Sequence, residues 1–326
     1  SKAKTCTEFR NAARQWSTPS QNIVFADREG NIGYLLAGKI PSRKKGQGKL
    51  HVPGWTDEYD WDSYLPFEAL PSLDNPAQGF IVTATNRVID AEYPVKLELE
   101  PITGDRAQRI TEMIIDVRLR GGNLKIDRDY IKKMQYDRCS PTGRTIRRCL
   151  AKIQPQYYAS ILDNEGEFLL NVIRAWDGAL TPESQAAVIY QVFIRELIQL
   201  LLENKLSHGK KGGKFTGTAS ELTARIMGKG ATPILAEQTL FGYRCFSWVS
   251  ELYSTKDTDW FDLGGGENRD QCFLLAFQNT IDKLKKELGK DPKEWSWGKI
   301  HRLTINHPLG SNPILGSVFN IGPYPI

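Results

Sequence analysis

Hydroxyl and amide side chains end a short apolar run, and their spacing suits hydrogen bonding to a reacting carbonyl group. The run extends from Gly79 to Arg87 (GFIVTATNR) and follows the turn signal Asn75-Pro76. Its apolar, β-branched first half is typical of a buried strand. We therefore predict a strand that presents Thr83, Thr85 or Asn86 to a cleft, where such donors stabilise negative charge. The alternative is that these residues only end the strand and cap the next loop.

The composition limits the classes of partner. The chain has 326 residues, of which 40% are hydrophobic and 25% charged, enough for one large domain or two ordinary ones. A net charge of +5 is mild at this length, and the dense basic runs, Arg43 to Lys45 and Arg144 to Lys152, lack interleaved aromatic residues. We expect solvated basic faces and no nucleic-acid partner. No apolar run approaches membrane-spanning length, so we expect no membrane partner either.

Cysteine and histidine spacing does not indicate a metal or a cofactor. The number of cysteines is odd, no Cys-x-x-Cys pair occurs, and His301 and His307 are six residues apart and distant from any cysteine. These patterns predict neither a zinc cluster nor a disulfide framework. Cys139 and Cys149 flank a basic segment that could lower a thiol pKa, although half-buried, unreactive thiols are the alternative.

The segments before the Gly79 run predict a helix and a hairpin that position it. Apolar residues recur at helical spacing from Ala3 to Trp16, and the runs Asn22–Ala26 and Ile32–Leu36 flank the turn sequence DREGN. The glycine- and proline-rich segment Lys39–Gly54 is expected to be an irregular exposed loop. The aromatic residues that follow it could line an apolar pocket or could be loop residues fixed to the core; they are Trp55, Tyr59, Trp61, Tyr64 and Phe67.

Helical patterns dominate after Arg106. The apolar stripe of residues 184–204 is broad, which indicates a buried helix. We expect an α+β chain with a sheet and helix core over residues 1–108 and a mostly helical region over residues 109–326. The predicted helices are Arg109–Leu119, Tyr130–Tyr136, Thr145–Ile153, Glu167–Trp176, Ser184–Asn204 and Arg269–Leu288, and the glycine- and lysine-rich segment Ser207–Gly217 is predicted to be a connector.

Many short motifs in one order resemble the penicillin amidase (penicillin acylase) family of N-terminal nucleophile hydrolases. The resemblance runs nearly from end to end. Its motifs are Pro19 to Asp27, Gly30 to Tyr34, Ile40 to Arg43, Val52 to Trp55, Leu65 to Glu68, Asn75-Pro76, Gly79 to Ile81, Tyr93-Pro94, Gly104 to Ile110, Trp176 to Gly178, Trp295 to His301 and His307 to Leu309.

The resemblance implies the distal part of an αββα sandwich followed by a mostly helical region, and hydrolysis of linear amides. In the family a precursor cuts itself and exposes a serine, whose own α-amine, with a pKa of about 8, acts as base. An acyl-enzyme forms and is hydrolysed while an oxyanion hole binds the developing charge. Here Ser1 leads into a predicted helix, so the chain matches an internal part of the larger subunit. The expected partners are a small-molecule amide, the nucleophile segment and the smaller subunit.

Site residues transfer by alignment. The family's oxyanion asparagine aligns with Thr85, and Asn86 follows it; a threonine hydroxyl donates one hydrogen bond but is shorter than a carboxamide. Arg106 matches the family's active-site arginine, although a structural salt bridge of Arg106 with Asp105 or Glu112 is the alternative. Because losing one oxyanion donor costs about 10²–10³ in turnover, Thr85 keeps a second hypothesis open: a catalytically silent relative that acts as a binding or assembly module.

Calcium is a further expectation from the family, in which some members bind it through a carboxylate after the motif Tyr93-Pro94. The aligned residue here is Leu97, which has no ligand atom in its side chain. Glu98 or Asp90 could compensate, but we expect no metal and no other cofactor.

Overall fold

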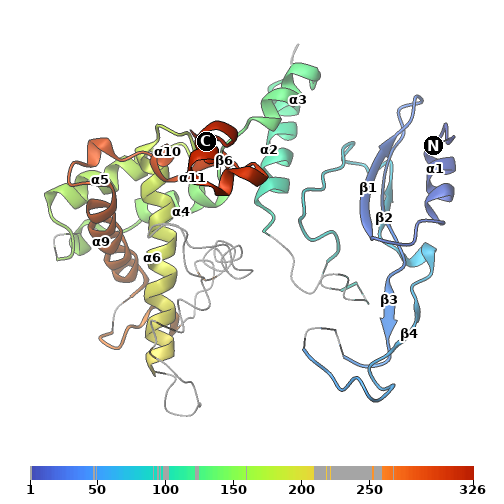
Figure 1. Cartoon of the computed structure of the whole chain (residues 1–326), viewed down its shortest axis with the longest axis horizontal. Coiled ribbons are helices and arrows are strands. Elements are labelled where there is room, and N and C mark those ends of the chain that lie inside the picture. Colours follow the sequence, from blue (N-terminus) through green and yellow to red (C-terminus); the bar gives the residue numbers. More distant parts are fainter. Residues whose placement is uncertain are drawn as a thin grey trace. The chain divides into compact units, whose positions relative to one another are not determined.

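The computed structural model divides into two compact units, Ser1–Leu124 and Lys125–Ile326, which we call the sheet unit and the helical unit (Figure 1). The expected boundary after residue 108 lies within helix α2 (Asp105–Arg120). The structure describes residues 2–46, 48, 50–90, 92–93, 95, 97, 103–121, 125–158, 160–208, 218, 221, 252, 259–266 and 268–326.

The predicted hairpin forms the centre of the sheet unit. Strands β1 (Gln21–Ala26) and β2 (Ile32–Ala37) are antiparallel, and β5 (Ser72–Asp74) pairs with the other edge of β2, giving the order β1-β2-β5. The central strand is almost entirely buried, whereas most residues of β1 are exposed. The hairpin prediction is therefore confirmed, and β2 supplies half of the buried apolar residues described in this unit.

The turn between β1 and β2 is organised by one carboxylate. Asp27 accepts hydrogen bonds from the backbone N–H groups of Glu29 and Asn31 and from the Asn31 side chain. It also accepts a hydrogen bond from the Cys6 backbone, at the start of helix α1 (Cys6–Ala13). These donors, with Asn31 foremost, lower the pKa of Asp27 to about 2.

The predicted first helix is confirmed, and it contacts the sheet through rings and an ion pair. Phe9 of α1 lies 4.9 Å from Phe25 of β1 between ring centroids. Arg10 of α1 pairs with Asp74 of β5 at 2.8 Å. Thr5 caps the helix by accepting a hydrogen bond from an N–H of its first turn.

The prediction of an irregular loop over 39–54 is wrong in part. Residues Pro41–Arg43 form strand β3, which pairs with β4 (Trp61–Tyr64). The partner strand is distant in sequence and rich in aromatic residues, which favour strands, and no pattern in the loop itself indicates it. The rings of Trp61 and Tyr64 lie 6.3 Å apart, and both side chains are exposed.

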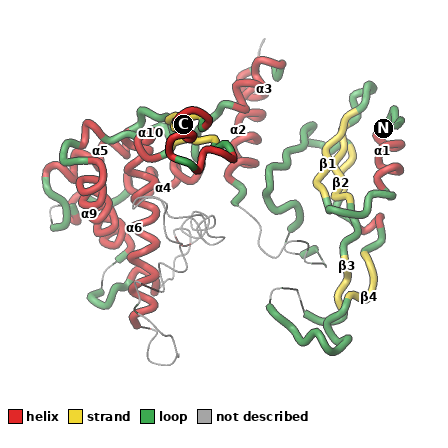
Figure 2. The backbone as a smooth tube through the Cα atoms, viewed as in Figure 1, coloured by secondary structure: helices red, strands yellow, loops and turns green. Residues whose placement is uncertain are grey.

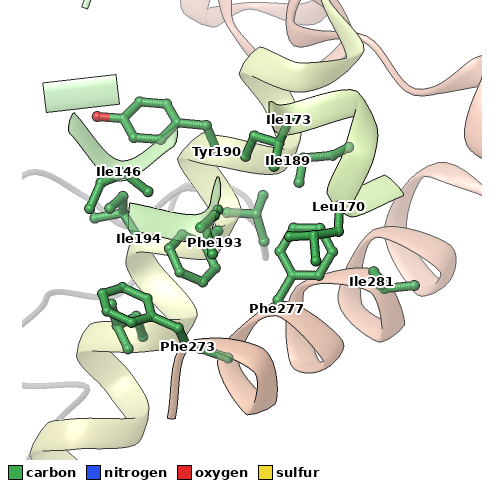
Figure 3. Packing of buried hydrophobic residues seen from close by; sticks show 14 of the residues in the cluster. Ile146, Leu170, Ile173, Ile189, Tyr190, Phe193, Ile194, Phe273, Phe277 and Ile281 are labelled. Atoms are coloured by element: carbon green, nitrogen blue, oxygen red, sulfur yellow. The ribbon is translucent and has the colours of Figure 1, made fainter. Parts of the chain in front are cut away.

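The helical unit is built around two long helices, α6 (Gln185–His208) and α9 (Arg269–Leu288), which contact each other extensively (Figures 1 and 2). Figure 3 shows Phe193 of α6 between the α9 rings Phe273 and Phe277, at 5.7 and 6.1 Å between centroids. The other elements are α3 (Arg128–Gln135), α4 (Pro141–Ala151), α5 (Asn164–Ala175), α10 (Trp297–Ile300), β6 (Arg302–Ile305), α11 (Pro313–Phe319) and β7 (Ile321–Pro325).

The six helices predicted from periodicity all exist, and α9 has the predicted bounds. The expectation that no apolar run reaches membrane-spanning length is wrong for Gln185–Ser207 by length and composition, but 72% of the apolar window is buried inside the unit. This helix is apolar all round because other helices cover it. The predicted connector Ser207–Gly217 lies mostly outside the described residues.

Candidate active site

The Gly79–Arg87 stretch is irregular, so the predicted strand is wrong. Among the described residues, positions 80–85 belong to no strand, and the side chains of Ile81, Val82 and Thr83 are half-buried. Strand propensity measures how well a side chain fits a half-buried surface more than a backbone preference. A β-branched run can therefore be buried here without pairing in a sheet.

Thr85 has the least favourable backbone of the stretch. Its φ is +61°, in the left-handed region that a β-branched residue rarely adopts. Its hydroxyl donates to the Ala84 carbonyl oxygen and accepts a long hydrogen bond of 3.5 Å from Nη1 of Arg106. A threonine hydroxyl has a single proton, so the O–H bond of Thr85 must turn away from the Ala84 carbonyl oxygen, about the Cβ–Oγ1 bond, before it can donate to a substrate.

Asn86 directs its amide at the local backbone. Its Oδ1 accepts the N–H of Ala84 at 3.0 Å, and its Nδ2 donates to the Arg87 carbonyl oxygen at 2.9 Å. This side chain closes the turn around Thr85 in the manner of the alternative prediction, in which the polar residues cap a loop. A hydrogen bond from Asn86 to a substrate therefore requires one of these contacts to open.

Arg106 lies in the first turn of α2, and its contact with Thr85 brings two of the three predicted site residues together. The side chain is exposed. Glu112, one proposed partner of Arg106, instead accepts hydrogen bonds from Gln108 and Arg109 at 2.9 and 3.4 Å. A guanidinium group has five N–H donors, so the Thr85 contact occupies only part of its capacity.

The Tyr93 motif lies in a turn beside this stretch. The hydroxyl of Tyr93 donates to the Ala69 carbonyl oxygen, and burial raises the pKa of Tyr93. Asp90 accepts the backbone N–H groups of Glu92 and Tyr93 through Oδ1.

The residues near Tyr93 do not fit a calcium ion. One carboxylate oxygen of Asp90 serves the turn, Leu97 offers no side-chain oxygen, and Glu98 lies outside the described residues. Within the described part of the chain, no group of three or more His, Cys, Asp or Glu side chains could hold a metal. Calcium usually takes six to eight oxygen ligands, and we derive no step through it.

Ser1 lies outside the described residues, and helix α1 begins at Cys6 with Thr5 as its N-cap, so the helix start lies several residues after Ser1. Among the aromatic residues, Trp55 is 86% exposed and Phe67 lies under Arg14, whose guanidinium carbon is 4.4 Å from its ring centroid. Their role in an acyl pocket stays a prediction.

Comparison with known proteins identifies the family of this chain. The model of the family described as Penicillin amidase matches residues 1–326. The chain belongs to the penicillin amidase family. The resemblance noted from short motifs is thereby confirmed over its full extent, and the members of this family are acylases of amide bonds.

The similar proteins are acylases. Penicillin acylase 2 proenzyme of Pseudomonas sp. (strain SE83) is 33% identical over 331 residues, which cover 99% of this chain and 37% of that protein. Acyl-homoserine lactone acylase QuiP of Pseudomonas aeruginosa is 27% identical, with 92% of this chain and 34% of that protein covered. The chain thus spans about a third of the length of these curated relatives.

A solved structure supports the fold. Thermostable penicillin G acylase from Alcaligenes faecalis matches with a TM-score of 0.61 at 20% identity, covering 90% of this chain and 52% of that chain. The predicted α+β fold class is therefore confirmed, with a fold similar to that of this acylase.

Sequence patterns missed one contact of the stretch. Arg118, in the last turn of α2, donates to the Gln78 carbonyl oxygen and lies over the ring of Phe80. The only available signal was a cation at a helix C-terminus, which ordinarily indicates an interaction with the helix dipole.

Proposed function

We propose that the whole protein hydrolyses linear amide bonds of small molecules through an acyl-enzyme, with a nucleophile in a part of the protein outside these 326 residues. The proposal rests on the family match over the whole chain. It is supported by the contact of Arg106 with Thr85, the two residues aligned with the family's oxyanion and active-site arginine positions.

In this reaction the nucleophile oxygen bonds to the amide carbonyl carbon, and the carbonyl oxygen takes up negative charge. The carbon–nitrogen bond then breaks, the amine leaves with a proton, and water hydrolyses the resulting ester. Arg106 and Thr85 are the proposed donors to the charged oxygen, Thr85 after its hydroxyl rotates. Asn86 is a further donor if one of its hydrogen bonds within the turn opens. Preorganised donors of this kind are the usual largest contribution to such catalysis.

A catalytically silent binding or assembly protein is the second candidate, and one observation favours it. The Thr85 hydroxyl donates to the Ala84 carbonyl oxygen, and Nδ2 of Asn86 donates to the Arg87 carbonyl oxygen. Both groups that could replace the family's asparagine are thus turned to local acceptors.

The deciding experiment uses the full-length protein with chromogenic phenylacetyl and long-chain acyl amides. We expect turnover, a covalent adduct whose mass exceeds that of the protein by the acyl group, and no turnover by the 326 residues alone. Thr85→Asn is expected to raise kcat, by at most about 10²–10³, the usual contribution of one such donor. Thr85→Val should lower it.

Two outcomes would contradict the proposed hydrolase function. A folded full-length protein that forms no adduct and stays inactive as wild type and as Thr85→Asn leaves the silent binding or assembly function. Turnover by the 326 residues alone would contradict the assignment of the nucleophile to another part of the protein.

A further inference from the structure

Arg118 holds the beginning of the Gly79–Arg87 stretch by two different contacts. Its Nη1 donates to the Gln78 carbonyl oxygen, and its guanidinium carbon lies 5.7 Å from the centroid of the Phe80 ring. The Gln78 side chain closes the same turn by donating to the Phe80 carbonyl oxygen at 2.8 Å. One guanidinium group thus fixes the backbone and the ring on both sides of Gly79.

Gly79 is the residue that makes this approach possible. Its φ is +71°, and a Cβ atom at this position would lie 2.9 Å from Nη2 of Arg118. The left-handed backbone favours glycine, and a side chain at this position would require the Arg118 guanidinium group to shift. The turn and the arginine are therefore matched to each other.

The end of the stretch is held by the same helix. Arg106 contacts Thr85 through Nη1, at the opposite end of α2 from Arg118. Arg106, in the first turn of α2, contacts Thr85, whereas Arg118, in the last turn, contacts Gln78 and Phe80. The stretch is therefore held to α2 near both of its ends.

We propose that Arg118 is a positioning residue, which sets the place of Thr85 relative to Arg106 by anchoring the far end of the stretch. The inference rests on the proposed function for its effect on catalysis. Arg118 acts through the chain from Gln78 to Thr85 and has no contact with the proposed donors. Removing the Arg118 side chain leaves Thr85 and Arg106 in place, but residues 78–85 are then held to α2 only through Thr85.

Helix α2 provides a matched control two residues away. Arg120 is also exposed and near the helix C-terminus, but it pairs with Asp116 of the same helix at 2.8 Å. Arg118→Met and Arg120→Met remove the same charge from the same turn. Only the first removes contacts with the Gly79–Arg87 stretch.

The test compares these variants in the full-length protein by amide hydrogen exchange of residues 79–86 and by steady-state kinetics. In Arg118→Met we expect exchange to rise about fivefold, the ordinary worth of one hydrogen bond, and kcat to fall several-fold with KM unchanged. Arg120→Met should change neither, and Arg118→Lys, which keeps a donor and a cation, should restore most of both.

Several outcomes overturn the proposal. These are unchanged exchange in Arg118→Met, equal effects in Arg118→Met and Arg120→Met, and faster exchange with an unchanged kcat in an active enzyme. If the wild-type protein is inactive, the proposed function fails, and the exchange rate of the Thr85 amide in Arg118→Met alone decides whether Arg118 positions Thr85.

Discussion

The two units differ in where their apolar side chains lie. In the helical unit, α6 and α9 bury Phe193, Phe273 and Phe277 almost completely, and one continuous cluster extends to α4 and α5. In the described part of the sheet unit the buried apolar residues are few and half of them come from β2, while Val24 and Leu73 on the flanking strands are about half exposed. Packing therefore defines the helical unit, whereas the stretch that carries the candidate site is defined by hydrogen bonds and cation–ring contacts.

Ion pairs show the same contrast. Lys283 and Glu196 pair at 2.9 Å between α9 and α6, with side chains 24% and 10% exposed. Lys44 and Asp57 of the sheet unit pair at 3.0 Å with side chains 40% and 83% exposed. Exposed pairs contribute little because water screens them. Substitutions should accordingly cost most in the helical core and least at the surface of the sheet unit.

The largest effect is expected from Phe193→Ala. Removing a ring packed between Phe273 and Phe277 leaves a cavity, and such changes cost about 3–5 kcal/mol of unfolding free energy. Chemical denaturation followed by far-ultraviolet circular dichroism measures the loss. Phe168→Ala, at a ring that is 58% exposed, is the control and should change little. Similar losses in both variants would contradict the assignment of the core.

Gly143→Ala sharpens the comparison within the helical unit. Glycine to alanine inside a helix usually stabilises by about 1 kcal/mol. At Gly143 of α4, however, a Cβ would lie 2.8 Å from the ring of Trp176. We expect a net destabilisation of about 1–3 kcal/mol, the usual cost of overpacking, in the same denaturation experiment. A more stable variant would show that Trp176 moves aside without cost.

In the sheet unit, the substitution Thr85→Gly is expected to increase the unfolding free energy slightly. Thr85→Gly removes a side chain that disfavours a φ of +61°, so the unfolding free energy should rise by up to about 1 kcal/mol. Hydrogen exchange of the β2 amides reports the stability of this unit. Thr83→Gly is the matched control and should destabilise, because Thr83 has no positive φ to relieve.

The smallest expected effect is a loss of hairpin stability at acidic pH, when Asp27 becomes protonated. Asp27 has a pKa of about 2 in the folded protein, below its ordinary value of 3.8. The ionised form is therefore favoured by folding, and its stabilising contribution is present above about pH 4 and is lost as the pH falls toward 2. Hydrogen exchange of the hairpin amides should accelerate over this interval. Asp27→Asn, which cannot titrate, should show a flatter pH profile.

Sequence predicted the parts of the molecule that local signals specify. The DREGN turn predicted the hairpin, and α9 was predicted with its bounds; in the structure, Asn268 and Gln271 form a capping box at its start. Strand β3 escaped prediction because its partner lies far along the chain. The Gly79–Arg87 stretch was mistaken for a strand because its β-branched residues are half-buried without pairing in a sheet.

The candidate site was predictable in membership but not in geometry. Alignment with the family selected Thr85, Asn86 and Arg106, and the structure brings Thr85 and Arg106 into contact. The left-handed backbone of Thr85 was not predictable, because a β-branched residue argues against that conformation. The anchor at Arg118 depends on a tertiary contact across 40 residues, which no local pattern encodes.

The ribbon formed by β6 and β7 has a consequence for handling the polypeptide. In the described part of the chain these strands pair only with each other, and Ile305, Ile321 and Tyr324 on them are each more than half exposed. Pro323 and Pro325 have no backbone N–H group, so β7 lacks two hydrogen-bond donors. The edge of β6 is therefore the more continuous one for pairing with a strand from another molecule. Concentrated solutions of the isolated 326 residues should therefore aggregate by pairing of β6 edges and become turbid. The substitution Ile305→Lys should prevent this aggregation.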